Sequence, residues 1–260
     1  MSIKNITLIG SGNVAHHLGI RLQECGLNIV EVYSRTTENA AVLANQLNVK
    51  KTIQSADIER NSDLYILAIS DDAIEKVALQ LSKILPAKSH VVHTSGVTSS
   101  SVFEGKFQHY GVFYPLQSFS KSKAADFQQI PICVDASNSI LQEKLKALAC
   151  KISPKVYEIT DEQRAYLHLA AVYANNFTNY LFHVAHQILE QQKIPFELVQ
   201  PLILETAQKV QENAPSLMQT GPAIRGDEVS IQRHFKLLKK NEEWKQIYQL
   251  LSKRIGEEMK

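Results

Sequence analysis

The sequence predicts an α/β fold in which an N-terminal parallel sheet is followed by an all-helical C-terminal domain. Three observations support it. Short β-branched segments alternate with helical patterns up to about residue 157, a glycine loop follows the first segment, and residues 158–260 are helical in pattern almost throughout. Alternating strands and helices are typical of βαβ units with right-handed crossovers. We therefore expect a nucleotide-binding domain over 1–157 and a helical substrate and dimerisation domain over 158–260.

The strands of the first domain are predicted from short apolar runs and the helices from amphipathic patterns between them. Segment 63–69, DLYILAI, is typical of a strand buried on both faces. The other predicted strands are 6–10, 28–34, 49–53, 89–96, 110–116, 130–135 and 155–159. Helices are expected over 13–24, 37–47, 73–84 and 140–150.

The second domain is expected to begin with one long helix. Thr160 and Gln163 have the spacing of a capping box, which starts helices. No Gly or Pro then interrupts the pattern up to Gln192, which predicts a helix of roughly 30 residues. Further helices are predicted over 195–213, 229–239 and 242–259, with a loop between the first two.

Composition and charge exclude several classes of partner. The 260 residues carry a formal net charge of +2, with no basic patch of the kind that binds nucleic acid or an anionic membrane. No apolar run approaches the roughly 18 residues of a membrane span, and the N-terminus lacks a signal-peptide cleavage site. Three cysteines without ligand spacing indicate reduced thiols, so we expect a cytoplasmic protein. His183 and His186 lack an acidic partner, and no metal site is predicted.

The glycine loop is the most informative motif. Residues 10–15, GSGNVA, match the GxGxxA variant of the Rossmann dinucleotide fingerprint, placed after a strand and before a helix. Gly10 allows the tight turn, Gly12 lets a pyrophosphate approach the backbone, and Ala15 lets the helix pack on the strand. A tight turn without a ligand is the alternative. The expected cofactor-binding residues are Gly10, Ser11, Gly12, Asn13, Val14 and Ala15.

The end of the second strand indicates which dinucleotide is bound. Enzymes that prefer NAD usually place an acid there to bind the ribose hydroxyls, but Glu31 lies too early in the strand. Arg35 can instead pair with a 2′-phosphate and stack on adenine, while Ser34 and Thr36 can donate hydrogen bonds. A solvated surface arginine is the alternative. These residues together favour NADP.

Several segments together resemble a known family. They are GSGNVA, VYSRT, ILAISDDAI, HTSG, YPLQSF, HLAAVYANNF and GPAIRGD. They resemble a bacterial family of NADP oxidoreductases that pairs a Rossmann-like domain with a helical domain of unknown function, over essentially the whole chain. The sequence is more distantly similar to pyrroline-5-carboxylate reductase, the deazaflavin-dependent NADP oxidoreductases and the β-hydroxyacid dehydrogenases. The resemblance implies a helical domain of the 6-phosphogluconate dehydrogenase-like type, a cofactor at the carboxyl edge of the sheet, and a homodimer.

The long helix carries a polar stripe that includes His168 and Asn176. Between Tyr166 and Gln187 it has no charged residue, whereas a solvent face normally carries Lys and Glu. We therefore expect His168 to orient a substrate or supply its proton, and Asn176 to orient it. A neutral histidine in a domain interface is the alternative. The resemblance to β-hydroxyacid dehydrogenases places Val172 where those enzymes have a catalytic lysine, so their mechanism is not expected.

The ends of two later strands complete the predicted site. Ligands bind open α/β sheets at the carboxyl ends of the strands, which here carry Ala68, Ile69 and Ser70, and then Thr94 and Ser95. We expect the first four to contact the cofactor and Ser95 to act as a catalytic residue. Gln117 and Arg225 are further candidates, and Asp71 and Asp72 are interpreted as helix caps. The predicted function is hydride transfer between NADP(H) and a small imine, carbonyl or flavin-like substrate; the alternative is a non-catalytic NADP(H) sensor.

Overall fold

The structure, a computed structural model, describes residues 2–258. These residues form two compact units, one up to Val172 and one from Tyr173 onwards. The division falls later than the 157/158 boundary expected from the sequence. The reason is that helix α5 (Asp161–Ala171) is fixed to the first unit by its side chains.

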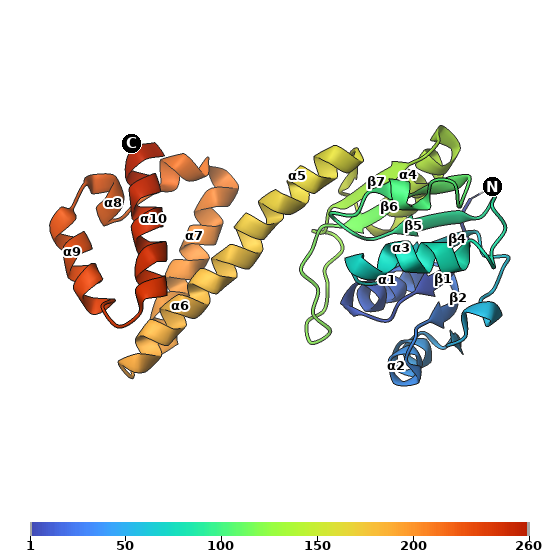
Figure 1. The fold of residues 1–260 in the computed structure, drawn as a ribbon, viewed down its shortest axis with the longest axis horizontal. Helices are drawn as coiled ribbons and strands as arrows, with labels where there is room; N and C mark the ends of the chain where they lie inside the picture. Colours follow the sequence, from blue (N-terminus) through green and yellow to red (C-terminus); the bar gives the residue numbers. More distant parts are fainter. Residues whose placement is uncertain (1, 259–260) are drawn as a thin grey trace. The chain divides into compact units, whose positions relative to one another are not determined.

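The described part of the first unit contains one eight-stranded sheet of order β3-β2-β1-β4-β5-β6-β7-β8 (Figure 1). All pairs are parallel except β6 with β7. The predicted strands are thus present, but the seventh runs antiparallel, which the sequence analysis did not foresee. The strands are β1 (Asn5–Ile9), β2 (Asn28–Tyr33), β3 (Lys50–Thr52), β4 (Leu64–Leu67), β5 (His90–His93), β6 (His109–Pro115), β7 (Ile132–Ala136) and β8 (Val156–Glu158).

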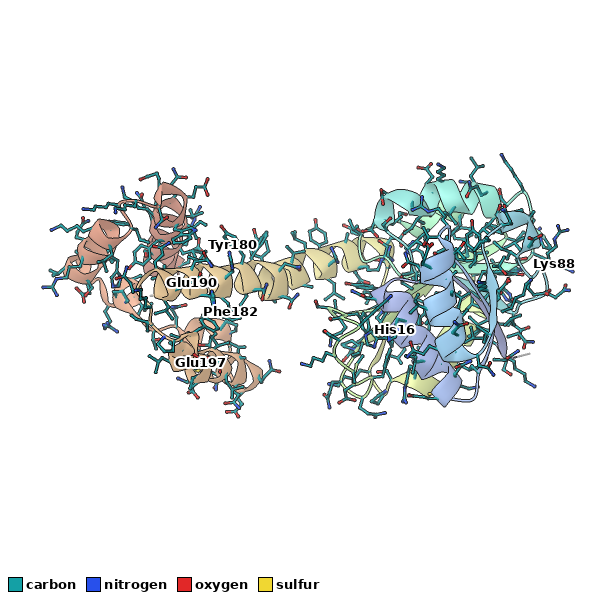
Figure 2. All side chains as sticks on the ribbon, turned by 90° about the horizontal axis from the view of Figure 1, so that it is seen from below. His16, Lys88, Tyr180, Phe182, Glu190 and Glu197 are labelled. Atoms are coloured by element: carbon teal, nitrogen blue, oxygen red, sulfur yellow. The ribbon has the colours of Figure 1, made fainter. Side chains whose placement is uncertain are left out.

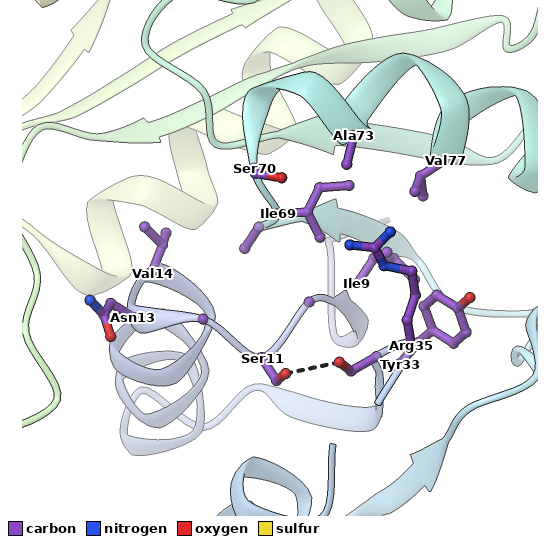
Figure 3. Close-up of a pocket in the computed structure, with 14 residues that line it drawn as sticks. Ile9, Ser11, Asn13, Val14, Tyr33, Arg35, Ile69, Ser70, Ala73 and Val77 are labelled. Atoms are coloured by element: carbon purple, nitrogen blue, oxygen red, sulfur yellow. Dashed lines mark hydrogen bonds between the residues drawn. The ribbon is translucent and has the colours of Figure 1, made fainter. Parts of the chain in front are cut away.

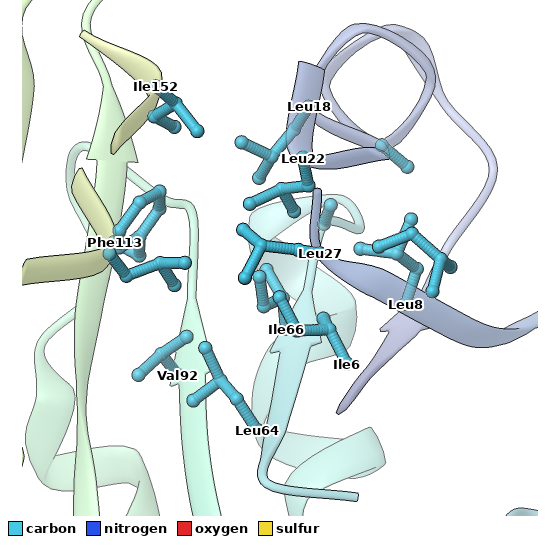
Figure 4. Close-up of a cluster of buried hydrophobic side chains, with 14 of the residues drawn as sticks. Ile6, Leu8, Leu18, Leu22, Leu27, Leu64, Ile66, Val92, Phe113 and Ile152 are labelled. Carbon is cyan, nitrogen blue, oxygen red and sulfur yellow. The ribbon is translucent and has the colours of Figure 1, made fainter. Parts of the chain in front are cut away.

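Helices cover both faces of this sheet because successive strand residues point to opposite sides. Ile6 and Leu8 of β1 pack into the cluster that includes residues of α1 (Asn13–Glu24), α2 (Thr37–Leu47) and α4 (Ser139–Ile152), part of which is shown in Figure 4. Ile9 belongs to the cluster on the opposite face, with residues of α3 (Asp71–Leu81). This doubly covered sheet confirms the predicted fold class.

The predicted long helix is present but not uniform. Thr160 and Gln163 form the capping box that starts α5. Residues Val172–Phe177 then form a π-helical segment, in which the Thr178 hydroxyl donates to the Tyr173 carbonyl at 3.0 Å, and α6 (Thr178–Gln191) follows. The stripe predicted with regular α-helical periodicity therefore does not extend unchanged past Val172, because a π turn takes up extra residues.

The second unit consists of helices with little buried apolar surface. In its described residues only Ile231 and Leu238 are buried hydrophobic side chains. Figure 2 shows the side chains of α6, among them Tyr180 and Phe182. The other helices are α7 (Gln200–Glu212), α8 (Pro222–Arg225), α9 (Glu228–Leu237) and α10 (Glu242–Glu258). Among the residues described, no helix is both long and apolar enough to cross a membrane.

Candidate active site

The turn between β1 and α1 requires glycine at its first position. Gly10 has φ +120°, a conformation that side chains disfavour, and a Cβ there would lie 2.2 Å from the carbonyl oxygen of Ala68. Its amide donates to the Tyr33 carbonyl at 2.7 Å, which ties the turn to the end of β2. Gly10 is therefore fixed by the packing of the chain itself.

Gly12 differs from Gly10, because neither the backbone conformation nor the packing of the described chain requires a glycine at this position. Its φ of −73° suits any residue, and a Cβ built there meets nothing within 4 Å. It is the N-cap of α1, but no side chain caps the helix and its first turn holds no acidic residue. An uncapped helix end presents backbone N–H groups and a positive dipole, which attract an anion. The missing side chain at Gly12 thus fits a phosphate that needs close approach to the backbone.

A pocket of about 320 Å³ opens over this turn (Figure 3). Most of the predicted cofactor residues line it. Ala15, Thr36 and Thr94 do not: Ala15 is fully buried, and Thr36 is the exposed N-cap of α2. The predicted residues that line the pocket are Gly10, Ser11, Gly12, Asn13, Val14, Ser34, Arg35, Ala68, Ile69 and Ser70, and the sequence analysis missed Ile9, Tyr33, Ala73 and Val77.

The end of β2 supplies polar groups to the pocket. The Ser11 hydroxyl donates to the Ser34 hydroxyl at 3.0 Å. Arg35 is exposed, and in Figure 3 its guanidinium points toward the wall formed by Ile69 and Val77. Glu31 is fully buried and accepts hydrogen bonds from the Thr52 hydroxyl and the Glu59 amide, so its carboxylate is occupied within the sheet. The exposed charge at this strand end is thus positive.

The neighbouring strand ends lie along the same edge, because β1, β4, β5 and β6 are parallel. Thr94 follows β5 and is fixed to β4 by its amide, which donates to the Leu67 carbonyl at 3.1 Å. The Ser95 hydroxyl donates to Thr98 Oγ1 at 2.9 Å and accepts from the backbone amides of Val97 and Thr98. Ser95 therefore shapes the turn after β5 and has its hydrogen-bonding capacity largely used there.

His168 contacts this edge from α5. Its Nδ1 lies 3.2 Å from the Tyr114 hydroxyl, at the end of β6. A Cβ at Gly96 would lie 2.4 Å from the same Nδ1, so only glycine lets the imidazole come this close. Burial raises the pKa of Tyr114 to about 12, which keeps the phenol neutral near pH 7. His168 was predicted from the sequence as a site residue, whereas Tyr114 was not, because its only signal was a polar side chain at a strand end.

Arg164 anchors the helix that carries His168. Its side chain is 1% exposed; one guanidinium nitrogen donates to Asp161 at 2.7 Å and another to the Thr98 carbonyl. Asp161 also accepts from the amide and hydroxyl of Ser100. Burial and the Arg164 charge lower the pKa of His93 to about 4, so this histidine is neutral. Arg164 precedes His168 by one turn and was missed, although it is the one basic residue near the start of α5.

The remaining polar candidates of the long helix belong to the second unit. Asn175 and Asn176 are exposed within the π-helical segment of the second unit, as are His183 and His186 on α6. The described residues contain no cluster of three or more potential metal ligands.

The other candidates predicted from the sequence are exposed and make local contacts or none. Asp227 caps α9 by accepting from the Ser230 amide and hydroxyl, while Arg225 is exposed. Gln117 accepts from the Ser118 amide. Asp71 and Asp72 lie in the first turn of α3, where their negative charges interact favourably with the helix dipole. The N-cap of α3 is Ser70, so neither aspartate is the cap.

Comparison with known proteins gives two family matches. Residues 5–95 match the family described as NADP oxidoreductase coenzyme F420-dependent, and residues 130–255 match a domain of unknown function, DUF2520. No match was found among curated proteins.

Solved structures extend the similarity over the whole chain. The crystal structure of the "putative NADP oxidoreductase" from Bacteroides fragilis is 41% identical, covers 98% of each chain and has a TM-score of 0.93. An imine reductase from Myxococcus stipitatus in complex with NADP⁺ is 14% identical, covers 96% of this chain and 92% of its own, and has a TM-score of 0.68.

A pyrroline-5-carboxylate reductase from Coxiella burnetii is 14% identical, covers 98% of this chain and all of its own, and has a TM-score of 0.62. At such identities the last two structures show a shared fold. The match to the Bacteroides protein is far stronger and spans both units. The chain therefore belongs to the family of NADP oxidoreductases in which a Rossmann-type domain is joined to the DUF2520 helical domain.

Proposed function

We propose that the chain binds NADP(H) over the turn Gly10–Val14 and transfers hydride between the nicotinamide and a small substrate. One juxtaposition carries the proposal. The uncapped, open glycine turn and the Tyr114–His168 pair lie on the same carboxyl edge of the parallel strands. Family membership and the NADP⁺ complex of the similar imine reductase support the choice of cofactor.

Different residues of the pocket suit the two phosphate-bearing parts of the cofactor. The N–H groups at the start of α1 suit the pyrophosphate, whereas Ser34 and Arg35 suit a 2′-phosphate. Arg35 also offers a planar face to adenine. The buried carboxylate of Glu31 is engaged with Thr52 and Glu59, which leaves no acid for a free ribose 2′-hydroxyl at this strand end. The pocket therefore favours NADPH over NADH.

Bound NADPH supplies the hydride, and the chain has to supply a proton when a C=O or C=N bond is reduced. We assign that role to His168. Its Nδ1 is held by Tyr114, so Nε2 is the ring nitrogen left to face a substrate. In the imidazolium form Nδ1–H donates to the phenol oxygen, while the Nε2 proton passes to the oxygen or nitrogen of the substrate. Tyr114 fixes the ring, and Arg164 fixes the helix that carries it.

Asn176 is proposed to orient the substrate through its amide. It is exposed and lies in a π-helical segment, a feature frequently found at functional sites. Val172 precedes it by one turn and cannot transfer a proton, which leaves the role to His168. Ser95 is proposed to support the substrate pocket through the turn that it shapes.

We further propose that the chain is a cytoplasmic homodimer assembled through its helical unit. This unit exposes large apolar side chains that a monomer would leave in water. Leu198, Leu217 and Leu237 are 70%, 73% and 79% exposed. A second copy of the same helices is the simplest cover for them.

The test is calorimetric titration of the protein with NADPH and NADH, followed by incubation with carbonyl, imine and flavin compounds. We expect tighter binding of NADPH and transfer of deuterium from C4-deuterated NADPH to one compound class. Binding without transfer to any class would favour the alternative function, a non-catalytic NADP(H) sensor. Failure to bind NADPH would refute the proposal.

A further inference from the structure

The segment between β6 and β7 packs against the glycine turn and brings a lysine to it. The Asn13 side-chain amide donates to the Phe119 carbonyl at 2.9 Å, and His17 Nε2 lies 2.9 Å from the Ser120 carbonyl. The Phe119 ring stacks on the His17 ring with centroids 5.3 Å apart. These contacts fix the segment to the first two turns of α1. The next residue, Lys121, is thereby held beside the turn.

The Lys121 ammonium contacts the turn itself. Its Nζ donates to the carbonyl oxygen of Ser11 at 3.2 Å. Ser11 lies between Gly10 and Gly12, the residues that shape the predicted phosphate site, and it lines the cofactor pocket. Ser11 and Lys121 are 110 residues apart in sequence, so the glycine fingerprint gives no sign of this contact.

The charge of Lys121 is not neutralised by a neighbour. In the described part of the chain, no carboxylate lies within ion-pair distance of it. The ionisable side chains that line an adjoining hollow with Lys121 are His16 (labelled in Figure 2), His17, Arg21 and Glu24. The one acid among them, Glu24, pairs with Arg21 at 3.4 Å. Burial, His17 and Lys121 all lower the pKa of His16, in that order, so the ammonium is felt at the second turn of α1.

From these contacts we propose that Lys121 is a cofactor-binding residue that neutralises the pyrophosphate of NADP(H). The inference rests on the proposed function. The start of α1 supplies N–H donors but no full charge, and Arg35, two residues after the end of β2, lies across the pocket from Asn13 in Figure 3. A lysine on a flexible four-carbon stem can turn one of its three donors from the Ser11 carbonyl to a phosphate oxygen. With Lys121 beside the turn and Arg35 in the pocket wall, each phosphate-bearing end of the adenosine moiety has one cation near it.

Lys121 and Arg35 should affect the binding of different ligands. ADP-ribose carries the pyrophosphate without a 2′-phosphate, and 2′-AMP carries the 2′-phosphate without a pyrophosphate. Loss of the Lys121 charge should therefore weaken ADP-ribose, NADPH and NADH and leave 2′-AMP unchanged. Loss of Arg35 should weaken 2′-AMP and NADPH far more than ADP-ribose, which loses only the contact with adenine.

The experiment is calorimetric titration of wild type, Lys121→Gln, Lys121→Arg and the matched control Lys123→Gln with ADP-ribose, 2′-AMP and NADPH. Glutamine keeps a polar donor at this position but has no charge, and Lys121→Arg keeps the charge, so the two variants together separate a charge effect from a change in the loop. We expect Lys121→Gln to weaken ADP-ribose and NADPH about tenfold and 2′-AMP less than about twofold. Arginine should retain most of the affinity, and the control should match wild type.

Salt gives an independent readout. The difference between wild type and Lys121→Gln should shrink as NaCl rises from about 0.05 to about 0.5 M, because an exposed charge is screened. Wild-type affinity of Lys121→Gln for ADP-ribose would overturn the inference, as would an equal loss of 2′-AMP affinity, which would indicate a distorted pocket. Wild type that binds none of the three ligands would refute the proposed function itself and this inference with it.

Discussion

Substitution of Gly12 by alanine separates ligand binding from folding. A Cβ at Gly12 meets nothing within 4 Å and the backbone has φ −73°, so the chain itself accommodates it. Alanine is a poorer N-cap than glycine, by up to about 1 kcal/mol. It also stabilises the fold by about 0.4–1 kcal/mol because it restricts the unfolded chain. We therefore expect the free energy of unfolding to change by less than about 1 kcal/mol, or a few degrees in Tm.

Gly12 lines the pocket, so in the proposed binding mode the same methyl group would compete with the pyrophosphate for space. Displacing the phosphate from one backbone N–H group removes a charge-assisted hydrogen bond worth about 1.5–3 kcal/mol. The Kd for NADPH should therefore rise about 10- to 100-fold in Gly12→Ala, measured by calorimetry beside thermal unfolding. Gly10→Ala is the contrasting variant, because its Cβ would lie 2.2 Å from the Ala68 oxygen at φ +120°, and it should fail to fold. Wild-type affinity for NADPH in Gly12→Ala would refute the reasoning.

Four further predictions follow from the site and the fold. Arg35→Ala should weaken NADPH by about 1.5–3 kcal/mol and NADH much less in the same titration, because NADH loses only the adenine contact; equal loss for both would be inconsistent with a 2′-phosphate contact. With a substrate in hand, His168→Ala should lower kcat/KM by about 10²-fold and Tyr114→Phe by less, with NADPH affinity unchanged in both. Burial alone raises the pKa of Asp161, but hydrogen bonds from Ser99 and Arg164 outweigh it, so the net effect is a lowered pKa. The ionised carboxylate therefore stabilises the fold above its unfolded-state pKa of about 3.9, and this stabilisation is lost as pH falls through the lower folded-state pKa. Asp161→Asn should accordingly lower Tm at neutral pH, and its Tm should converge with that of wild type in acid. Light scattering at micromolar concentration should give twice the chain mass, and a monomer would exclude the proposed dimer.

Local sequence was sufficient for much of the fold and for half of the site. The strands, α1 and the Gly10–Val14 turn depend on periodicity and on residues that are neighbours in the chain, which a single sequence displays. The antiparallel direction of β7 was not predictable in this way, because an apolar strand pattern does not specify the direction of pairing.

The other half of the site depends on contacts between distant residues. Tyr114 and His168 are 54 residues apart, and Thr98 and Arg164 are 66 apart. No periodicity connects such pairs, so Tyr114 and Arg164 were missed even though His168 was identified. The π-helical segment was missed for another reason: its sequence contains no Gly or Pro, and nothing in its pattern distinguishes it from a regular helix.

The most direct test of the proposed function is a crystal structure of the protein with NADP⁺ bound. The account predicts the pyrophosphate on the N–H groups of Gly12–Val14, the 2′-phosphate bonded to Ser34 and Arg35, and the nicotinamide on the side of the edge where Tyr114 and His168 meet. A cofactor bound away from the glycine turn, or a nicotinamide that no group of His168 or Tyr114 can approach through a substrate, would contradict it.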